Sequence, residues 1–285
     1  MRELSSNGVA IPFDDAHFRP MTDSTDVRSD AGELRARFHR DGYVLLRSVL
    51  DRVQVLDLRA DYFGRFDPAM LAPGTTPREG VFSGALPAAL PRYGVAGHPA
   101  YDTVRSERFD TLTRAPALAA VATCLLAEPV QLLRRRILRH FHNGAGTASR
   151  AHVDFDYMNR GSGRSVTAWI PLGDYPIDAG GITYLEGSQG VDRSVLDGLR
   201  GHTDRPDDRR PVSNDLGLTA RTLGGRWLWT QFRAGDVVFH SPHIVHASLD
   251  NHSDVMRLSA DIRFVPEGAD TDPRWAQDWA ADDGY

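Results

Sequence analysis

Hydrophobic and polar residues alternate most regularly near the end of the chain, over residues 256–264. Because successive side chains of a strand point to opposite faces, this pattern predicts a strand with two distinct faces. One face is apolar and the other polar: Met256, Leu258, Ala260, Ile262 and Phe264 against Arg257, Ser259, Asp261 and Arg263. An ordinary surface strand has the same pattern, so the polar face alone assigns no function.

Short β-type runs with turn signals between them fill the second half of the chain. They lie at residues 130–141, 151–158, 165–171, 182–185, 226–232, 236–240, 244–249 and 256–265. About eight short strands in such a series predict a sandwich, a barrel or a jelly roll. Residues 192–225 interrupt the series with a long polar stretch. Loops longer than ~12–15 residues are usually functional lids or disordered segments.

The first half of the chain is dominated by helix-like patterns. Residues 1–30 are polar and predict an extended arm; helices are predicted at 33–39, 52–66 and 115–126, a strand at 43–49, and a Pro/Gly-rich loop at 71–100. We expect a single domain over residues 1–285. It would have mostly helical support over 31–128, the β core with its insertion over 129–265, and a C-terminal tail over 266–285 with a short helix at 272–279.

Composition and charge remove several classes of function. All 33 basic residues are arginine, so mechanisms that need lysine, such as Schiff bases and P-loop phosphate binding, are excluded. A net charge of −5 without a basic, aromatic-interleaved stripe gives no sign of nucleic-acid binding. The single cysteine, Cys124, excludes a disulfide framework and is expected to be a buried structural thiol. Without an apolar run near ~18 residues or a signal-peptide pattern, we expect a cytoplasmic protein with no membrane partner.

A His-x-Asp pair, which can hold a metal ion, occurs four times in this chain. Residues i and i+2 of a strand point to the same side, about 6–7 Å apart, so both can reach one ion. Two histidines and one carboxylate form the facial triad typical of non-haem Fe(II) oxygenases. Only one pair lies in a β-type run of the strand series; the four are His39/Asp41, His152/Asp154, His202/Asp204 and His252/Asp254.

The remaining histidine ligand is not settled by the pattern of residues. Four histidines crowd one region: His240, His243, His246 and His252. His246 and Ser248 would share a face of the strand at 244–249, but the pattern leaves His243 and His246 nearly equal candidates.

Several motifs together carry a resemblance to a known family. They are Gly-Tyr-Val at 42–44, His152-x-Asp154, Thr-Ala-Trp-Ile-Pro at 167–171, Gly180-Gly181 leading to Gly187-Ser188, Gly235-Asp236, and His246 followed eleven residues later by Arg257. In this combination the chain resembles the phytanoyl-CoA dioxygenase family of iron(II)/2-oxoglutarate oxygenases over residues 38–264, most closely its bacterial members of specialised metabolism. The resemblance implies a double-stranded β-helix (a jelly roll, cupin-like) with flanking N-terminal helices and a lid-like insertion at 192–225.

The resemblance also implies roles for individual residues. His246 becomes the third metal ligand beside His152 and Asp154, and the 2-oxoglutarate pocket would contain Arg257, Ser248, Thr167 and Trp169. Arg257 would bind the distal carboxylate of 2-oxoglutarate, because a guanidinium pairs with a carboxylate through two parallel hydrogen bonds. A fold-stabilising ion pair for Arg257 and a core position for Trp169 remain as alternatives. The chain has Gln189 where the family usually has histidine, and we expect metal binding to be unaffected.

Three further residues are candidates for contact with the organic substrate. They are Arg139, Phe155 and Tyr157, which lie beside the proposed ligands or one strand before them. Structural roles fit each of them equally well.

The activity that the resemblance implies is the hydroxylation of an aliphatic C–H bond in a small-molecule metabolite of antibiotic or natural-product biosynthesis. It would use Fe(II), 2-oxoglutarate and O2, with ascorbate as a candidate reductant. Asp154 argues against halogenation, because related halogenases carry a small residue at that position. The alternatives are desaturation or cyclisation at the same iron centre, a zinc-dependent hydrolase or isomerase, and a non-catalytic binding module. The sequence carries no signal for the oligomeric state.

Overall fold

The computed structural model describes residues 3–145, 147–158, 163–200, 203, 207–208 and 210–281. Its larger sheet contains β4 (Tyr43–Leu46), β5 (Val130–Leu132), β6 (Ile137–Phe141), β7 (Val166–Pro171), β10 (Val237–His240) and β12 (Arg257–Pro266). The strand order is β4-β10-β7-β12, and both β5 and β6 pair with the far edge of the long β12. All these pairings are antiparallel.

The smaller sheet faces the larger one. It contains β3 (Phe18–Pro20), β8 (Ile182–Leu185), β9 (Trp227–Trp229) and β11 (His246–Ser248), in the order β11-β8-β9-β3. A buried cluster joins the two sheets, with Trp169 and Val238 from the larger and Tyr184 and Leu228 from the smaller. A separate hairpin of β1 (Glu3–Ser6) and β2 (Val9–Pro12) lies at the N-terminal end. Two packed, mainly antiparallel sheets confirm the mainly-β prediction.

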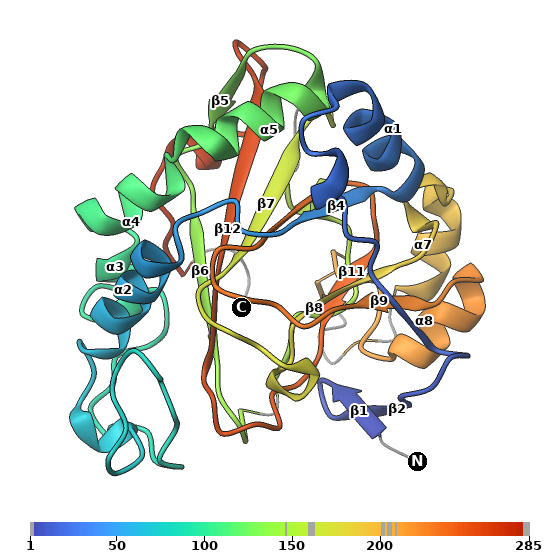
Figure 1. Cartoon of the computed structure of the whole chain (residues 1–285). Coiled ribbons are helices and arrows are strands. Elements are labelled where there is room, and N and C mark those ends of the chain that lie inside the picture. Colours follow the sequence, from blue (N-terminus) through green and yellow to red (C-terminus); the bar gives the residue numbers. More distant parts are fainter. Residues whose placement is uncertain are drawn as a thin grey trace.

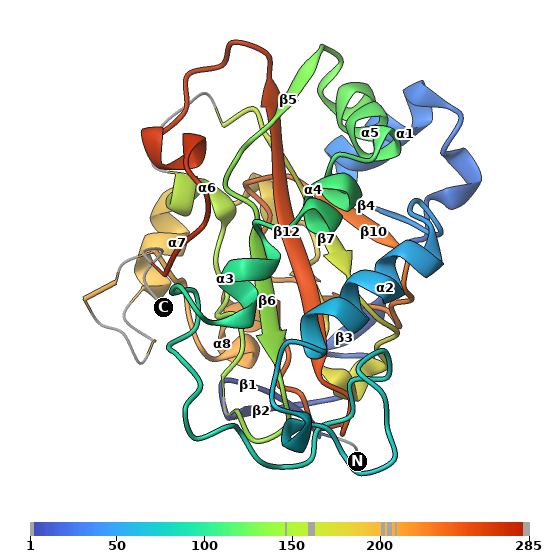
Figure 2. The ribbon, with the colours of Figure 1, turned by 90° about the vertical axis from the view of Figure 1, so that its left-hand side faces the viewer.

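Helices cover the outer face of the larger sheet (Figures 1 and 2). They are α1 (Ala31–Asp41), α2 (Arg52–Phe63), α3 (Pro99–Thr103), α4 (Glu107–Thr113) and α5 (Pro116–Leu126). The apolar face of β12 packs beneath them in one hydrophobic cluster, so the predicted alternation is confirmed. The polar face of β12 is also buried, however, because it looks inward between the sheets. This strand is therefore a central one, not a surface strand.

Residues at the two ends of α1 determine where this helix begins and where it ends. The side chain of Asp30 caps the first turn by accepting from the backbone N–H groups of Gly32 and Glu33. Gly42 ends the helix with φ 76°, a left-handed conformation that glycine adopts without strain. A Cβ on Gly42 would come within 3.0 Å of Ile244. Gly42 thus lets the chain pass directly from α1 into β4.

Two predicted strands differ from the observed elements. Residues 151–158 were expected to be extended, but only Ala151 and His152 form β-bridges, and α6 (Asp154–Met158) follows. Asp154 and Asp156 stand in the first turn of α6, where acidic side chains favour a helix start. Residues 130–141 form two strands, β5 and β6, and between them the side chain of Arg136 is buried and donates to Thr113.

Two predicted loops are more ordered than expected. The insertion at 192–225 contains α7 (Arg193–Leu199) and α8 (Leu216–Leu223), which bury leucines against the smaller sheet. Two ion pairs to the buried Asp156 join α7 and its C-terminal end to α6, one from the exposed Arg193 (2.5 Å) and one from the buried Arg200. In the N-terminal arm, β3 extends the smaller sheet by pairing in parallel with β9. In the described part of the tail, up to residue 281, the predicted helix is observed as a short 3-10 helix, Pro273–Ala276.

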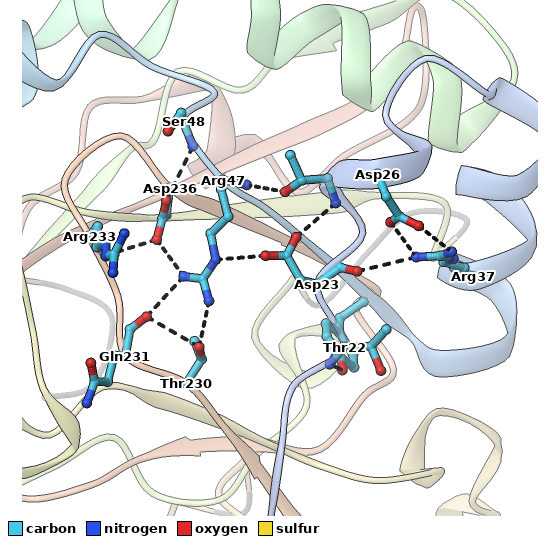
Figure 3. Close-up of polar contacts among 12 residues, drawn as sticks. Thr22, Asp23, Asp26, Arg37, Arg47, Ser48, Thr230, Gln231, Arg233 and Asp236 are labelled. Carbon is cyan, nitrogen blue, oxygen red and sulfur yellow. Dashed lines mark hydrogen bonds and ion pairs between the residues drawn. The ribbon is translucent and has the colours of Figure 1, made fainter.

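Arg47 at the end of β4 fastens the N-terminal segment to the sheet (Figure 3). Its guanidinium pairs with Asp23 at 3.1 Å and with the buried Asp236 at 2.6 Å. It also donates to Thr230 Oγ1 and to the carbonyl of Gln231. The network joins the N-terminal segment, β4 and the β9–β10 connection at one point.

Within the described residues, one helical segment is apolar and long enough to cross a membrane by length and composition alone, Glu107–Leu126. The expectation that the chain has no apolar run of that length is therefore wrong for this segment. The segment consists of α4 and α5, which break at Arg114 and Ala115. Leu118, Val121 and Leu125 are buried in the cluster beneath the helices. The segment thus packs one apolar face against the sheet, and a single segment of this kind is weak evidence for a membrane span.

Candidate active site

His152, Asp154 and His246 lie together between the two sheets. The Nε2 atoms of both histidines are 3.8 Å from Oδ1 of Asp154, and the three donor atoms all lie within 4.8 Å of one another. All three side chains are buried. Two imidazoles and one carboxylate at this spacing form a donor set that suits one divalent iron ion.

Backbone pairing explains how residues so distant in sequence converge. His152 and His246 form an antiparallel bridge in which each backbone N–H donates to the other's carbonyl at 2.9 Å. Their rings therefore lie side by side, with centroids 4.1 Å apart. The chain then turns into α6, and the first residue of this helix, Asp154, faces the two rings. The prediction that His152 and Asp154 share one strand face is wrong in its local geometry, although the two side chains do converge.

Each histidine of this group is held in the form that can bind a metal. Nδ1 of His152 bonds the carbonyl of Arg150 at 2.6 Å, and Nδ1 of His246 bonds the carbonyl of Ile244 at 3.0 Å. Nδ1 must donate to a carbonyl, so the lone pair is left on Nε2, which faces Asp154. Burial lowers the pKa of both imidazoles, and for His246 the nearby His152 and His240 lower it further. Both rings are therefore neutral near pH 7.

Asp154 is fixed by three side chains besides the two histidines. Its Oδ2 accepts a hydrogen bond from Thr167 at 2.6 Å and lies 3.4 Å from Nε2 of His240, and its Oδ1 accepts from Arg263 at 2.9 Å. Burial by itself would raise the pKa of Asp154, but Arg263 and the imidazoles of His240 and His246 hold it well below its usual value. The carboxylate is therefore ionised and held in one orientation.

The other predicted histidines lie elsewhere. His243, the rival of His246, is exposed, and its ring packs on Phe155 with centroids 5.0 Å apart. His39 and His252 are also exposed. The pair His202/Asp204 lies outside the described residues.

A small cavity of ≈ 20 Å³ adjoins the donor group on the inner side of the larger sheet. It brings together the four residues proposed for 2-oxoglutarate: Thr167, Trp169, Ser248 and Arg257. The hydroxyl of Thr167 is engaged with Asp154 and so supports the metal ligand. Trp169 both lines this cavity and packs on Phe232 in the core. The side chain of Gln189 is directed away and donates to the carbonyl of Arg40.

Arg257 is a buried cation whose charge has no acidic partner among the described residues. It is 1% exposed, donates to Ser248 Oγ at 3.2 Å and lies over the ring of Phe141 at 4.2 Å. Its Nε has no hydrogen-bond partner. Burial lowers the pKa of Arg257 to about 9; the charge of Arg139 adds to this effect, and Asp261 and Asp250 offset only part of it. The fold-stabilising ion pair considered for Arg257 is therefore not observed in the part of the chain that the structure describes.

A larger cavity of ≈ 560 Å³ opens on the other side of the donor group. Of the three candidate substrate residues, Arg139 and Tyr157 line it, whereas Phe155 lines neither cavity. The lining residues that sequence reasoning missed include Arg210, Arg263, Arg274 and Trp275. Only Arg263 carried a readable signal, because it stands on the same predicted strand face as Arg257.

Comparison with known proteins now identifies the family. The family model for phytanoyl-CoA dioxygenase (PhyH) matches residues 38–259. The chain belongs to the phytanoyl-CoA dioxygenase family. It is an oxidoreductase of the non-haem, 2-oxoglutarate-dependent class, whose cofactors are iron, 2-oxoglutarate and O2.

Relatives of this PhyH protein include a bacterial hydroxylase and a mouse protein with the same domain. It is 27% identical to 1-deoxypentalenic acid 11-beta-hydroxylase of Streptomyces arenae over 263 residues. This alignment covers 87% of this chain and 86% of the relative. It is 26% identical over 160 residues to phytanoyl-CoA dioxygenase domain-containing protein 1 of Mus musculus, which covers 55% of this chain and 52% of the relative.

Solved structures share the fold of this PhyH chain. The epimerase SnoN from nogalamycin biosynthesis, solved in complex with Fe3+, alpha ketoglutarate and nogalamycin RO, superimposes with a TM-score of 0.60 at 23% identity, covering 86% of this chain and 87% of that one. The carbocyclase SnoK gives 0.59 at 20% identity, covering 93% and 92%. At these identities the likeness shows the fold, and it confirms the jelly-roll prediction.

Proposed function

We propose that His152, Asp154 and His246 hold the iron of this oxygenase. The observation that carries the proposal is the group of three buried donors, within 4.8 Å of one another, at the boundary of two cavities. Iron at this point would supply the chemistry of the class, in which 2-oxoglutarate is decarboxylated to succinate and CO2 while O2 oxidises a C–H bond. The residues of this chain bind, orient and shield the reactants.

For the cosubstrate, we propose that Arg257 and Ser248 bind the distal carboxylate of 2-oxoglutarate in the small cavity. An unsatisfied buried guanidinium is unfavourable, and a carboxylate would satisfy both its charge and its free donors. Thr167 would act indirectly by keeping Oδ2 of Asp154 away from the metal. Trp169 would form an apolar wall.

For the organic substrate, we propose a small molecule of natural-product biosynthesis, hydroxylated at an aliphatic carbon. The hydroxylase of Streptomyces arenae supports this, because it matches most of the chain. Arg139 and Tyr157 are proposed to contact the substrate, since both line the large cavity. Desaturation or cyclisation would need the same donors, and analysis of the product would distinguish them. We also propose that the enzyme is cytoplasmic, since the candidate membrane segment found among the described residues packs its apolar face against the sheet.

The deciding experiment is an anaerobic absorption titration of metal-stripped protein with Fe(II) and then 2-oxoglutarate. A weak visible charge-transfer band that needs both components would show the keto acid bound to a protein-held iron. We expect His246→Gln to abolish the band and His243→Gln, an exposed neighbour of the same residue type, to leave it unchanged. A protein that binds Zn(II) well but never gives the band would contradict the proposed iron site.

A further inference from the structure

The metal donors lie at the boundary between the two cavities. Five residues line both of them: Arg139, Ser149, His152, Asp154 and Arg263. Two guanidinium groups therefore lie beside the metal donors at this boundary. Arg139 already forms an ion pair with Asp261. We therefore look to Arg263 as the guanidinium that binds a ligand at this boundary.

Arg263 has hydrogen-bond donors that nothing in the described protein satisfies. Its side chain is 3% exposed, and Nη2 donates to Oδ1 of Asp154 at 2.9 Å. Nε and Nη1 have no hydrogen-bond partner. A guanidinium has five N–H donors, and leaving buried donors unpaired costs about 1–3 kcal/mol each. The side chain thus keeps donors that an acceptor other than the described residues can satisfy.

The surroundings of Arg263 place that acceptor toward the large cavity. Its guanidinium lies over the ring of Trp275, 4.7 Å from the centroid, and Trp275 lines the large cavity but not the small one. Nε1 of Trp275 also lacks a partner. The small cavity, by contrast, contains the other unsatisfied arginine, Arg257.

We infer that Arg263 binds a carboxylate of the organic substrate, which is therefore an acid with an apolar body. The inference rests on the proposed function, because it takes the large cavity as the substrate site. The cavity volume of ≈ 560 Å³ lies within the range for small-molecule sites, and its walls include Leu86, Ile137 and Phe141. Since Arg263 also touches the metal ligand Asp154, the carbon that is oxidised lies only a few bonds from the acid group.

The same carboxylate chemistry has a second source, the keto-acid end of 2-oxoglutarate. The two sources predict different results. A substrate carboxylate makes Arg263 important for acids in the large cavity and leaves the affinity for 2-oxoglutarate nearly unchanged. If the carboxylate belongs to 2-oxoglutarate, Arg263 is important for the affinity for 2-oxoglutarate and has little effect on the binding of acids in the large cavity.

The test measures the binding of matched acids and esters to the holoenzyme with Fe(II) and 2-oxoglutarate, under anaerobic conditions. The probes are abietic, cyclohexanebutyric and 1-adamantaneacetic acids, each with its methyl ester, detected by the shift of the charge-transfer band. We expect at least one acid to bind wild-type protein at least about tenfold more tightly than its ester, as a charge-assisted pair allows. In Arg263→Gln the ratio should fall to about one, and in Arg263→Lys it should be intermediate.

Arg274→Gln is the matched control, because it removes a cation from the same cavity away from Asp154. It should keep the preference for acids. The inference is wrong if no acid binds wild-type protein more tightly than its ester, or if Arg274→Gln abolishes the preference as fully as Arg263→Gln. It is also wrong if Arg263→Gln weakens only 2-oxoglutarate. Failure of the proposed function would be distinct, since wild-type protein would then give no charge-transfer band.

Discussion

Arg59 and Arg257 are almost equally buried, yet their surroundings differ completely. Arg59 on α2 is 2% exposed, and all three of its guanidinium nitrogens donate to protein acceptors. These acceptors are the carbonyls of Arg78, Glu79, Gly80, Leu172 and Met256 and the hydroxyl of Tyr175. Among the described residues, the guanidinium of Arg257 makes a single hydrogen bond, to Ser248. The guanidinium of Arg59 thus has protein acceptors for all three of its nitrogens, whereas that of Arg257 keeps donors without an acceptor among the described residues.

This difference separates a structural arginine from a ligand-binding one better than burial or charge does. Because dehydrating a guanidinium is costly, a fold that buries it for stability surrounds it with acceptors. A fold that buries it with free donors keeps them for a bound molecule. Arg263 belongs with Arg257 in this respect, whereas Arg47 belongs with Arg59.

The largest expected effect is on the structural member of the pair. Arg59→Met should lower the free energy of unfolding by about 3–5 kcal/mol, because it leaves several buried acceptors without a donor. Urea denaturation followed by circular dichroism would measure it. A loss below about 1 kcal/mol would show that the acceptors of Arg59 are satisfied elsewhere and would break the comparison.

The same substitution at Arg257 should change ligand binding rather than stability. Arg257→Met should weaken 2-oxoglutarate binding about 100-fold, since it removes charge-assisted hydrogen bonds to a carboxylate. Its free energy of unfolding without ligands should stay equal or rise, because an uncompensated buried charge has been removed. The charge-transfer titration and urea denaturation measure the two quantities. A strong loss of stability with normal 2-oxoglutarate affinity would reverse the assignment of Arg257.

A smaller effect is expected for the half-exposed network at Arg47 (Figure 3). Arg47→Met should lower the free energy of unfolding by about 1–2 kcal/mol, because Asp236 is buried but Arg47 and Asp23 are partly in water. Raising the salt concentration should reduce the difference from wild type. An effect as large as that of Arg59→Met would mean that exposure does not weaken the network.

The smallest effect concerns a buried group that, unlike arginine, can release its proton. Burial lowers the pKa of His98 to about 4, while its ordinary value is 6.5. Folding stability is therefore fully present above pH 6.5 and is lost as the pH falls toward 4, since the unfolded chain binds the proton more readily. His98→Asn, which can still cap α3, should flatten this part of the profile in thermal melts from pH 7 to 4.5. An unchanged profile would assign the acid sensitivity to other groups.

Much of the fold could be read from the sequence because strand alternation and helix caps act locally. The two faces of β12 are of this kind, and so is the helix predicted at 33–39, which the structure extends to Ala31–Asp41 between Asp30 and Gly42. The insertion at 192–225 could not be read, because its helices are stabilised by contacts such as Arg200 with Asp156 on α6. The helix at Asp154 was missed for a related reason: its residues also fit a strand, and the surrounding structure decided between the two.

For the site, the sequence by itself determined which residues were available. These were His152 and Asp154 two residues apart, several candidate histidines for the third ligand, and arginines on one face of β12. The family resemblance then favoured His246 over His243. Only the tertiary structure supplies the reason, because the backbone bridge to His152 turns His246 inward while the adjacent turn leaves His243 in solvent. It also decided which arginines have free donors, since hydrogen-bond partners from distant segments cannot be counted along a chain.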